Sequence, residues 1–258
     1  MSITIVPKSK QGQGAFNGGE IKENKPLGFP QDGGELKPYS NLFYWAHAWA
    51  EKTSTLGIHP HQGFEIMSFV LKGEIEHYDT KHQVWKKLQA GDAQIIRSGK
   101  GISHSEKFYK GSHIFQIWMD PNIVETLNQE ASYDDYEAES FPTEQHEGFS
   151  VKTYKGVGAP ITMDSIGLGI KEYILESGKH KLSLNKESVY SAYLIDGEIS
   201  VSDGDLVQDD FMVVKGTVQL EITAERTSQL FVIESPAKLD YPTYLELMKK
   251  RMRSVQSR

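Results

Sequence analysis

Two pairs of metal-ligand-type side chains, about 45 residues apart, constrain this chain more than any other feature. The first pair is His59 and His61, and the second is His104 and Glu106. Residues two apart on an extended strand point to the same side, so each pair presents two donors to one face. If the two strands are neighbours in a β-barrel, three imidazoles and one carboxylate converge on one point. This donor set suits a divalent first-row metal such as iron, manganese, nickel or zinc.

The residues between the two pairs predict short antiparallel strands. The apolar run Phe69–Leu71 comes before a turn glycine, Gly73, and Gly91-Asp92 marks a second strand-to-strand turn. Several short strands at this spacing indicate an antiparallel barrel or sandwich. A single H-x-H is often two surface histidines, so the second pair in a glycine-rich setting is what favours a metal site.

The same residues carry a resemblance to a known family. The chain has H-P-H-x-G-F-E from His59, then V-L-x-G-E-I-E-H, Gly-Asp-x-Gln, G-x-G-I-x-H-S-E and, at Gln116, Q-x-W. In these motifs it resembles the pirin family of bicupin proteins, and a weaker similarity continues to about Pro236. The resemblance implies that the N-terminal cupin holds the metal and that its ligands are His59, His61, His104 and Glu106.

An internal repeat predicts that the second half of the chain is another copy of the same fold. Phe69–Ile75 aligns with Tyr193–Ile199, each an apolar run followed by Gly-Glu-Ile. The same offsets place Ser183 and Asn185 opposite the first histidine pair, and the nearby His180 stands alone. The second copy is therefore expected to keep the scaffold without the metal ligands.

The expected fold class is all-β, a bicupin of two tandem antiparallel β-barrels of the jelly-roll type with a short C-terminal α-helix. The expected domains are an N-terminal metal-binding cupin, a degenerate cupin and a helical tail, at residues 1–140, 141–236 and 237–258. Residues 1–40 are expected to form a strand and a loop over the first barrel, and the acidic segment 133–137 a linker. Leu245, Met248 and Met252 form one apolar stripe, which predicts a helix docked on the barrel.

The composition of the chain limits the classes of binding partner and the cellular setting that we expect. A net charge of −7 and a pI near 5.7 argue against direct nucleic-acid binding, which rests on basic clusters. The absence of cysteine excludes disulfides and thiolate ligands, and it is consistent with a reducing compartment. The sequence has no apolar stretch of signal length and no run of about 20 apolar residues. We expect a cytoplasmic monomer that does not bind a membrane.

Three histidines and one carboxylate leave a six-coordinate metal with two open positions, which is the property of a catalytic site. We expect one divalent ion per chain, Fe(II) first, with Ni, Mn, Zn or Cu as alternatives. Glu106 is also the candidate catalytic residue, because it either remains a ligand or acts as general base toward a substrate hydroxyl. The local motif does not distinguish these two roles.

The resemblance implies two classes of function. One is a metal-dependent dioxygenase of the quercetin 2,3-dioxygenase type, whose substrates are dioxygen and an enol or flavonol. The other is a non-catalytic regulator that binds a transcription factor or a metabolic enzyme, with the oxidation state of the metal altering the contact surface.

Other residues compete for a role in the site. Glu65 stands four residues after His61, where an unbroken strand would keep it on the ligand face and a bulge at Gly63 would turn it away. The pirin resemblance assigns the fourth ligand to Glu106 instead.

Two further features concern the surroundings of the site. Arg97 either lines the mouth of the barrel and favours an anionic ligand, or faces solvent. Of the histidines outside the two ligand pairs, His47 is expected in the core or lining a pocket. Three others are expected near turns or on solvated strand faces: His77, His82 and His113. Gln62 and Lys100 stand where the pirin pattern usually has arginine.

Overall fold

The computed structural model describes residues 1–256 and is built almost entirely of antiparallel strands. The N-terminal half pairs its strands into a seven-stranded sheet and a four-stranded sheet. In order across the first sheet the strands are β12 (Ser132–Tyr136), β9 (Ala93–Arg97), β6 (Glu65–Lys72), β11 (His113–Met119), β4 (Leu42–Ala50), β3 (Ile21–Leu27) and β2 (Gly12–Phe16). Across the second they are β5 (Ser54–His61), β10 (Ile102–Phe108), β7 (Glu74–Asp79) and β8 (Trp85–Gln89).

The C-terminal half repeats this plan, as the internal sequence repeat predicts. Its seven-stranded sheet runs β1 (Ser2–Val6), β20 (Phe211–Lys215), β17 (Ser188–Asp196), β22 (Ser228–Pro236), β15 (Gly169–Leu175), β14 (Phe149–Lys155) and β13 (Thr143–His146). Its four-stranded sheet runs β16 (Gly178–Ser183), β21 (Gln219–Ala224), β18 (Glu198–Val201) and β19 (Gly204–Val207). The expected all-β bicupin architecture is confirmed. The strand pairing leaves each half as two facing sheets, so the expected closed barrels are cupin-like sandwiches instead.

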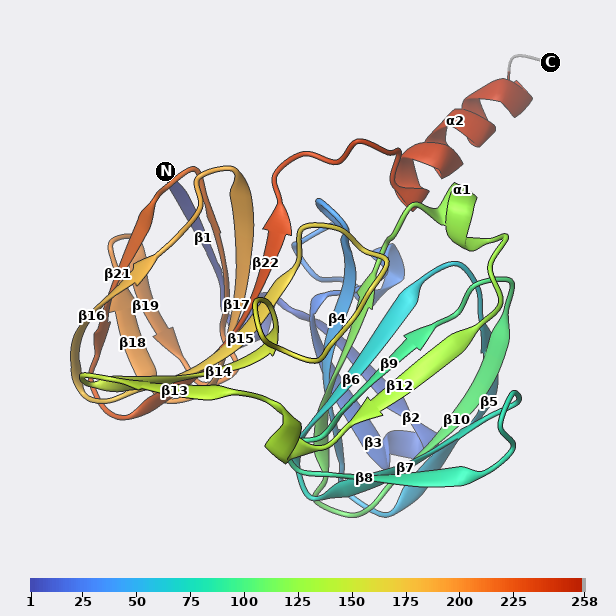
Figure 1. Cartoon of the computed structure of the whole chain (residues 1–258), viewed down its shortest axis with the longest axis horizontal. Coiled ribbons are helices and arrows are strands. Elements are labelled where there is room, and N and C mark those ends of the chain that lie inside the picture. Colours follow the sequence, from blue (N-terminus) through green and yellow to red (C-terminus); the bar gives the residue numbers. More distant parts are fainter. Residues whose placement is uncertain (257–258) are drawn as a thin grey trace.

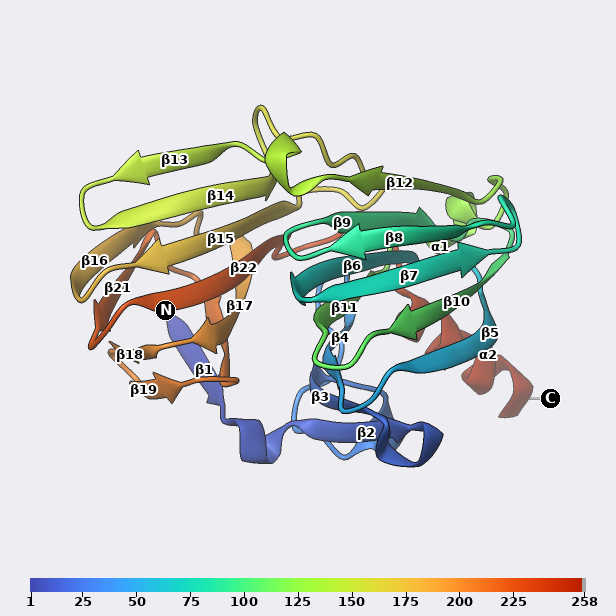
Figure 2. The same ribbon diagram turned by 90° about the horizontal axis from the view of Figure 1, so that it is seen from below.

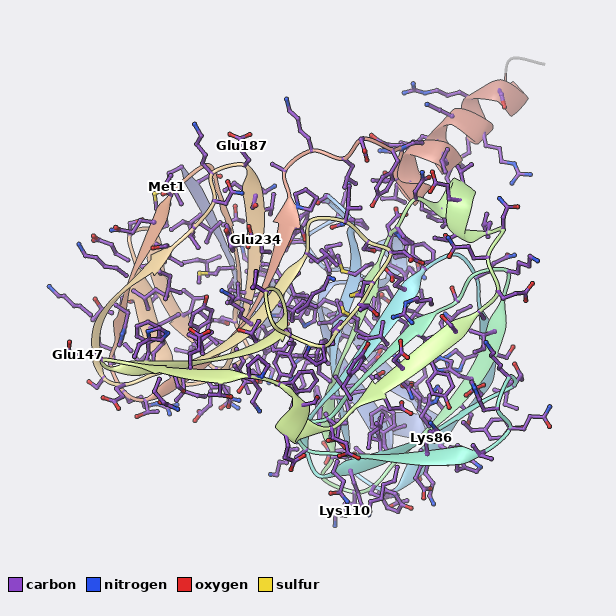
Figure 3. All side chains as sticks on the ribbon, in the orientation of Figure 1. Met1, Lys86, Lys110, Glu147, Glu187 and Glu234 are labelled. Atoms are coloured by element: carbon purple, nitrogen blue, oxygen red, sulfur yellow. The ribbon has the colours of Figure 1, made fainter. Side chains whose placement is uncertain are left out.

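The two seven-stranded sheets pack against each other in the middle of the molecule, so four layers result (Figure 2). The central core contains Trp45 and Phe115 from the first half with Tyr193 and Phe231 from the second, each at most 1% exposed. Figure 3 shows side chains from both halves meeting along this line. We call this boundary between the two seven-stranded sheets the seam.

The first strand does not belong to the half expected for it. β1 pairs with β20 of the C-terminal sheet, with Thr4 opposite Val213, and the chain then crosses through the short helix η1 (Lys8–Lys10) to β2 (Figure 2). The expected N-terminal domain, which begins at residue 1, is therefore wrong in including β1. This strand is an edge strand of the C-terminal seven-stranded sheet. At the far boundary β12 pairs with β9 and β13 pairs with β14, while the precise limits of the two cupins stay a prediction.

The acidic segment 133–137 is mostly an edge strand, not the expected linker. β12 pairs with β9, and Asp134 and Asp135 bond Arg97 and Lys86 at 2.8 Å and 2.9 Å. These ion pairs compensate the negative charge of the segment and allow it to lie on a sheet edge. The composition of the segment alone does not reveal these partners. Before it lies the short helix α1 (Ile123–Thr126), and three 3-10 turns complete the connections: η2 (Asn17–Gly19), η3 (Pro30–Asp32) and η4 (Ala138–Ser140).

The C-terminal helix α2 (Tyr244–Gln256) is docked only at its first turn (Figure 1). Asp120 accepts the backbone N–H of Tyr244 at 2.6 Å, and the Tyr244 ring packs on Phe43 and Phe64. Beyond that turn the helix projects from the body, and Met248 and Met252 are 37% and 64% exposed. The expected docking of the whole apolar stripe is wrong. Residues 257–258 of the expected tail lie outside the described residues.

A loop of the second half is fastened to the first half by Glu65 and Arg97, which stand opposite each other on β6 and β9. The buried Glu65 carboxylate accepts the backbone N–H groups of Asp164 and Ser165 at 2.7 Å and 2.8 Å. Arg97 donates to the side chain of Thr162 at 3.0 Å. These two side chains therefore serve the contact between the halves.

Replacing Glu65 is expected to weaken the fold. Glu65→Ala leaves two backbone N–H groups without their acceptor, which costs about 3 kcal/mol of unfolding free energy. Urea denaturation of the variant beside wild type measures this. Glu147→Ala is the matched control, because Glu147 is exposed on the turn between β13 and β14 (Figure 3) and is expected to stay within about 0.5 kcal/mol. Equal stability of the two variants would contradict the role of Glu65.

Candidate metal centre

The two sequence pairs lie on neighbouring strands. β5 and β10 are antiparallel, with His104 directly opposite His59 and a register shift between His104 and Glu106. His104 and Glu106 are both buried, as same-face residues two apart should be. Gly63 lets the chain leave β5, because its φ is +79° and a Cβ there would lie 2.6 Å from Ile123.

Three histidines come together at this point. The candidate ligand atoms of His59, His61 and His104 lie within 4.8 Å of one another, and the Nε2 atoms of His61 and His104 are 2.8 Å apart. His59 Nδ1 bonds the carbonyl oxygen of Gly57 at 2.8 Å, which leaves its Nε2 free for the cluster. A neutral imidazole has only one N–H group, so three rings this close cannot all donate hydrogen bonds to one another. A cation bound between their ring nitrogens would satisfy the remaining lone pairs.

Burial favours the neutral form of two of the three histidines, His61 and His104. It lowers the pKa of His61 to about 4, with the charge of His59 adding to the effect, and it lowers the pKa of His104 well below the ordinary value. A metal ion binds the neutral imidazole, so this electrostatic setting favours coordination at neutral pH.

Glu106 lies beside the cluster and is not one of its mutually close ligand atoms. Its carboxylate is buried and receives the Gln116 amide, with Nε2 3.0 Å from each carboxylate oxygen. Ser68 Oγ lies 3.4 Å from one of the same oxygens. Burial raises the pKa of Glu106, and His59 and the two hydrogen bonds oppose that rise. Its role as fourth ligand stays a prediction.

His77 is a part of the centre that the sequence interpretation missed. It is 1% exposed on β7, and its Nε2 lies 3.0 Å from Nδ1 of His104. The expected position near a turn or on a solvated face is therefore wrong. The bond orients the His104 ring and directs its Nε2 toward His61, as second-sphere partners of metal-binding histidines do. The signal in the sequence was alternation on Glu74–Asp79, which puts His77 on the inner face with Ile75.

The remaining candidates lie elsewhere. Glu65 belongs to β6, in the other sheet from β5, because the chain turns at Gly63 between the two strands. Arg97 takes neither expected role, since its guanidinium bonds Asp134 and Thr162. His47 is buried at the seam, which confirms the prediction of a core or pocket histidine. His82 lies half exposed near a turn, as expected.

A groove of about 440 Å³ gives access to the cluster from outside. Its lining includes His61, Gln62, Thr80 and Lys100. Gln62 donates its amide to the carbonyl oxygen of Lys100 at 2.9 Å, so the two residues that depart from the pirin pattern meet at the rim. A small molecule can therefore approach the histidines from this side.

The donor set fits a divalent metal. Two nitrogen ligands at about 2.1 Å and at right angles lie about 3.0 Å apart, close to the separation of His61 Nε2 and His104 Nε2. The buried carboxylate of Glu106 has a neutral amide and a hydroxyl as its hydrogen-bond partners. A bound cation would balance its charge.

The second half has no equivalent cluster among residues 1–256. Ser183 and the segment after it occupy the place of the first histidine pair, and His180 is buried with its Nε2 bonded to the carbonyl oxygen of Glu176 at 2.7 Å. The hydrogen-bonding need of His180 is thus met by the backbone, while the lack of metal ligands in the second copy stays a prediction. None of the helices in the described chain has the length and apolarity to cross a membrane.

Removing the His77 contact is expected to weaken metal binding without removing a ligand. His77→Gln should lower the affinity for Ni²⁺ or Fe²⁺ by about 10- to 100-fold, because the His104 ring loses its orienting partner. Competition with a chromophoric chelator measures the constant. His146→Gln, at an exposed histidine on β13, is the control and should leave affinity unchanged. Equal affinities in both variants would show that His77 is only a packing residue.

The metal-free protein is expected to lose stability as the pH falls from about 6.5 to about 4. Burial lowers the folded-state pKa of His77 to about 4, so between these values the unfolded chain binds a proton that the folded chain does not. Unfolding midpoints in urea across this range measure the decline. In His77→Gln the decline should be shallower than in wild type, and two parallel curves would contradict this assignment.

Comparison with known sequences finds similarity to one protein family. The Pirin family model matches residues 35–119. A pirin-like protein of Caulobacter vibrioides is 29% identical over 175 residues, covering 66% of this chain and 62% of that protein. Rat pirin is 27% identical over 195 residues, covering 68% and 64%, so the chain spans less than two thirds of both relatives. The quercetin 2,3-dioxygenase of Escherichia coli K12 is 41% identical over 70 residues, 25% of this chain and 29% of that one.

Solved structures share the fold. The bacterial pirin YhhW of Escherichia coli, in complex with nickel(II), superposes with a TM-score of 0.75 at 18% identity, covering 92% of this chain and all of that one. A quercetin 2,3-dioxygenase of Acinetobacter baumannii gives 0.77 at 19% identity, covering 99% and 89%. At these identities the likeness concerns the bicupin fold. The matched family model and the named relatives agree with this likeness: the chain is similar to pirin-family proteins over residues 35–119 and shares the bicupin fold of a solved bacterial pirin.

Proposed function

We propose that this protein is a metal-dependent dioxygenase that acts on flavonols or related enols, in the manner of a quercetin 2,3-dioxygenase. The observation that carries the proposal is the group of three histidines, one of which lines an open groove, with a buried carboxylate beside it. A protein of Escherichia coli that is 41% identical to this chain over 70 residues is named for this activity.

The proposed cofactor is one divalent ion per chain, Fe(II) first, with Ni, Mn, Zn or Cu as alternatives, because ligand type alone does not select among them. His59, His61 and His104 would hold it, with Glu106 as the fourth ligand. Such an ion supplies Lewis acidity and open positions for an enol oxygen and dioxygen.

The chain's own residues bind and orient the substrate. Trp118 places its ring against His61, with centroids 4.8 Å apart and planes at 87°, and so fixes the inner wall beside the ligand. Gln116 holds Glu106 by both oxygens, which positions the carboxylate for either of its two roles. Burial raises the pKa of the Glu106 carboxyl group, which makes its carboxylate a stronger base toward an enolic hydroxyl.

Oxygen uptake on purified protein tests the proposal. Wild type should carry close to one metal per chain and consume dioxygen when quercetin is added. His59→Ala should lose the metal and the uptake. Glu106→Gln keeps the size of the side chain and removes its charge, and we expect uptake to fall by at least about 100-fold. His146→Gln should behave like wild type. Full metal loading without uptake on quercetin or any related enol would overturn the dioxygenase.

A regulator is the second candidate, and one observation favours it. α2 projects from the body and exposes Met248 and Met252, and flexible methionines on an exposed face are suited to contact another protein. Metal binding without oxygen uptake would support this reading. The monomeric state, the cytoplasmic location and the lack of nucleic-acid binding remain predictions.

A further inference from the structure

A second cluster of polar side chains lies on the opposite face of the sheet that supports the metal centre. On β11, Gln116 reaches Glu106, whereas its neighbour Phe115 packs on Tyr193 of the second half, with ring centroids 4.8 Å apart. Side chains alternate between the two faces of a strand. His113, two residues before Phe115, therefore faces the seam and not the metal centre.

Three residues of this cluster form a row across neighbouring strands. His113 on β11 lies opposite Trp49 on β4 and opposite Lys72 on β6. The pairing of β11 with β6 shifts its register between His113 and Ile114, so the shared face is shown by the one cavity that Trp49, Lys72 and His113 line together. With neighbouring strands about 4.8 Å apart, this row carries two rings and one ammonium group along a line of about 10 Å.

A cavity of about 650 Å³ lies over this row, within the size range of small-molecule sites. Residues of both halves and of the connecting η1 line it, and those that matter here are Lys8, His47, Trp49, Lys72, His113 and Asp209. Its volume is larger than that of the groove beside the metal centre. No part of the proposed dioxygenase mechanism uses it.

Hydrogen bonds at the floor of the cavity fix which nitrogen of His113 is available. Tyr193 donates its hydroxyl to Asp209 at 3.0 Å, and His47 Nδ1 lies 3.1 Å from that hydroxyl and 3.3 Å from the carboxylate. The proton of His47 is therefore on Nδ1, and its Nε2 accepts from Nδ1 of His113 at 3.1 Å. His113 Nε2 remains as an acceptor, with no hydrogen-bond partner within the described chain.

The lining carries two lysines and two aspartates, and among residues 1–256 one of these lysines has no carboxylate partner. Asp209 is paired with Lys8 at 2.7 Å, and Asp196, also on the lining, is paired with Arg226 at 3.0 Å. Lys72 has no carboxylate within 4.0 Å among residues 1–256. An anionic group is therefore favoured near Lys72.

The aromatic side chains add a requirement for shape. The rings of Trp49 and His113 both line the cavity and lie within 18° of parallel, with centroids 6.5 Å apart. A planar ring of a ligand gains from packing on an aromatic side chain. A hydrogen-bond acceptor, an ammonium group and an aromatic ring are thus three separate features of one short row.

We propose that the seam cavity binds a small aromatic carboxylate that also carries a hydroxyl group. The carboxylate pairs with Lys72, the ring packs on Trp49, and the hydroxyl donates to His113 Nε2. These three side chains belong to the first half, and the ligand lies on the face of their sheet that is opposite to Gln116. Its binding does not depend on the proposed dioxygenase activity.

Isothermal titration of the metal-loaded full chain with 4-hydroxybenzoate tests the proposal. We expect saturable binding with one site per chain. Benzoate, which lacks the hydroxyl, and 4-hydroxybenzyl alcohol, which lacks the charge, should each bind about tenfold more weakly. Lys72→Gln and Trp49→Leu should each lower the affinity for 4-hydroxybenzoate by about tenfold, and Lys186→Gln, at another exposed lysine, should leave it unchanged.

Two results would overturn the proposal. The first is the lack of saturable binding of 4-hydroxybenzoate at millimolar concentration. The second is binding that Lys72→Gln and Trp49→Leu leave intact and that His61→Ala removes, which would place the probe on the metal. Oxygen uptake with quercetin is measured on the same variants, and because Lys72 and Trp49 lie on the other face of the sheet, a wild-type rate there separates this site from the proposed catalytic one.

Discussion

The antiparallel pairing of β5 with β10 is the contact on which the candidate centre depends. It sets His59 opposite His104, and the two-residue period of a strand then brings His61 and Glu106 to the same side. A slip of one residue would turn the inner side chains outward. The inner face of β7 adds His77 behind His104, so three strands of one four-stranded sheet define the ligand geometry.

Both faces of the seven-stranded sheet of the first half make contacts that matter for the candidate centre or for the seam. β11 presents Gln116 to Glu106 on one side, and His113 and Phe115 to the second half on the other. The second half, which lacks the histidine pair, covers this outer face with Tyr193 and Phe231. The second half thus stabilises the first, because it buries an apolar surface that an isolated first half would expose to water.

Much of this arrangement was predictable from local patterns, because i, i+2 spacing and turn glycines act over a few residues. The bicupin fold and the histidine cluster followed from them. The position of β1, the edge strand β12 and the projecting helix α2 did not, since each depends on partners distant in sequence such as Val213, Arg97 and Asp120. Glu65 and Arg97 were weighed as site residues for the same reason: their partners lie in the loop around Asp164, which no local motif reveals.

We propose that His59, His61, His104 and Glu106 together hold one divalent metal. Anomalous X-ray diffraction at the absorption edge of the metal, on crystals of the metal-loaded chain, locates the ion. We expect one peak per chain, with Nε2 of each histidine and one oxygen of Glu106 at about 2.0–2.2 Å. A peak at another place, or a peak at the histidines with Glu106 still held by Gln116 beyond about 3 Å, would contradict the four-ligand centre.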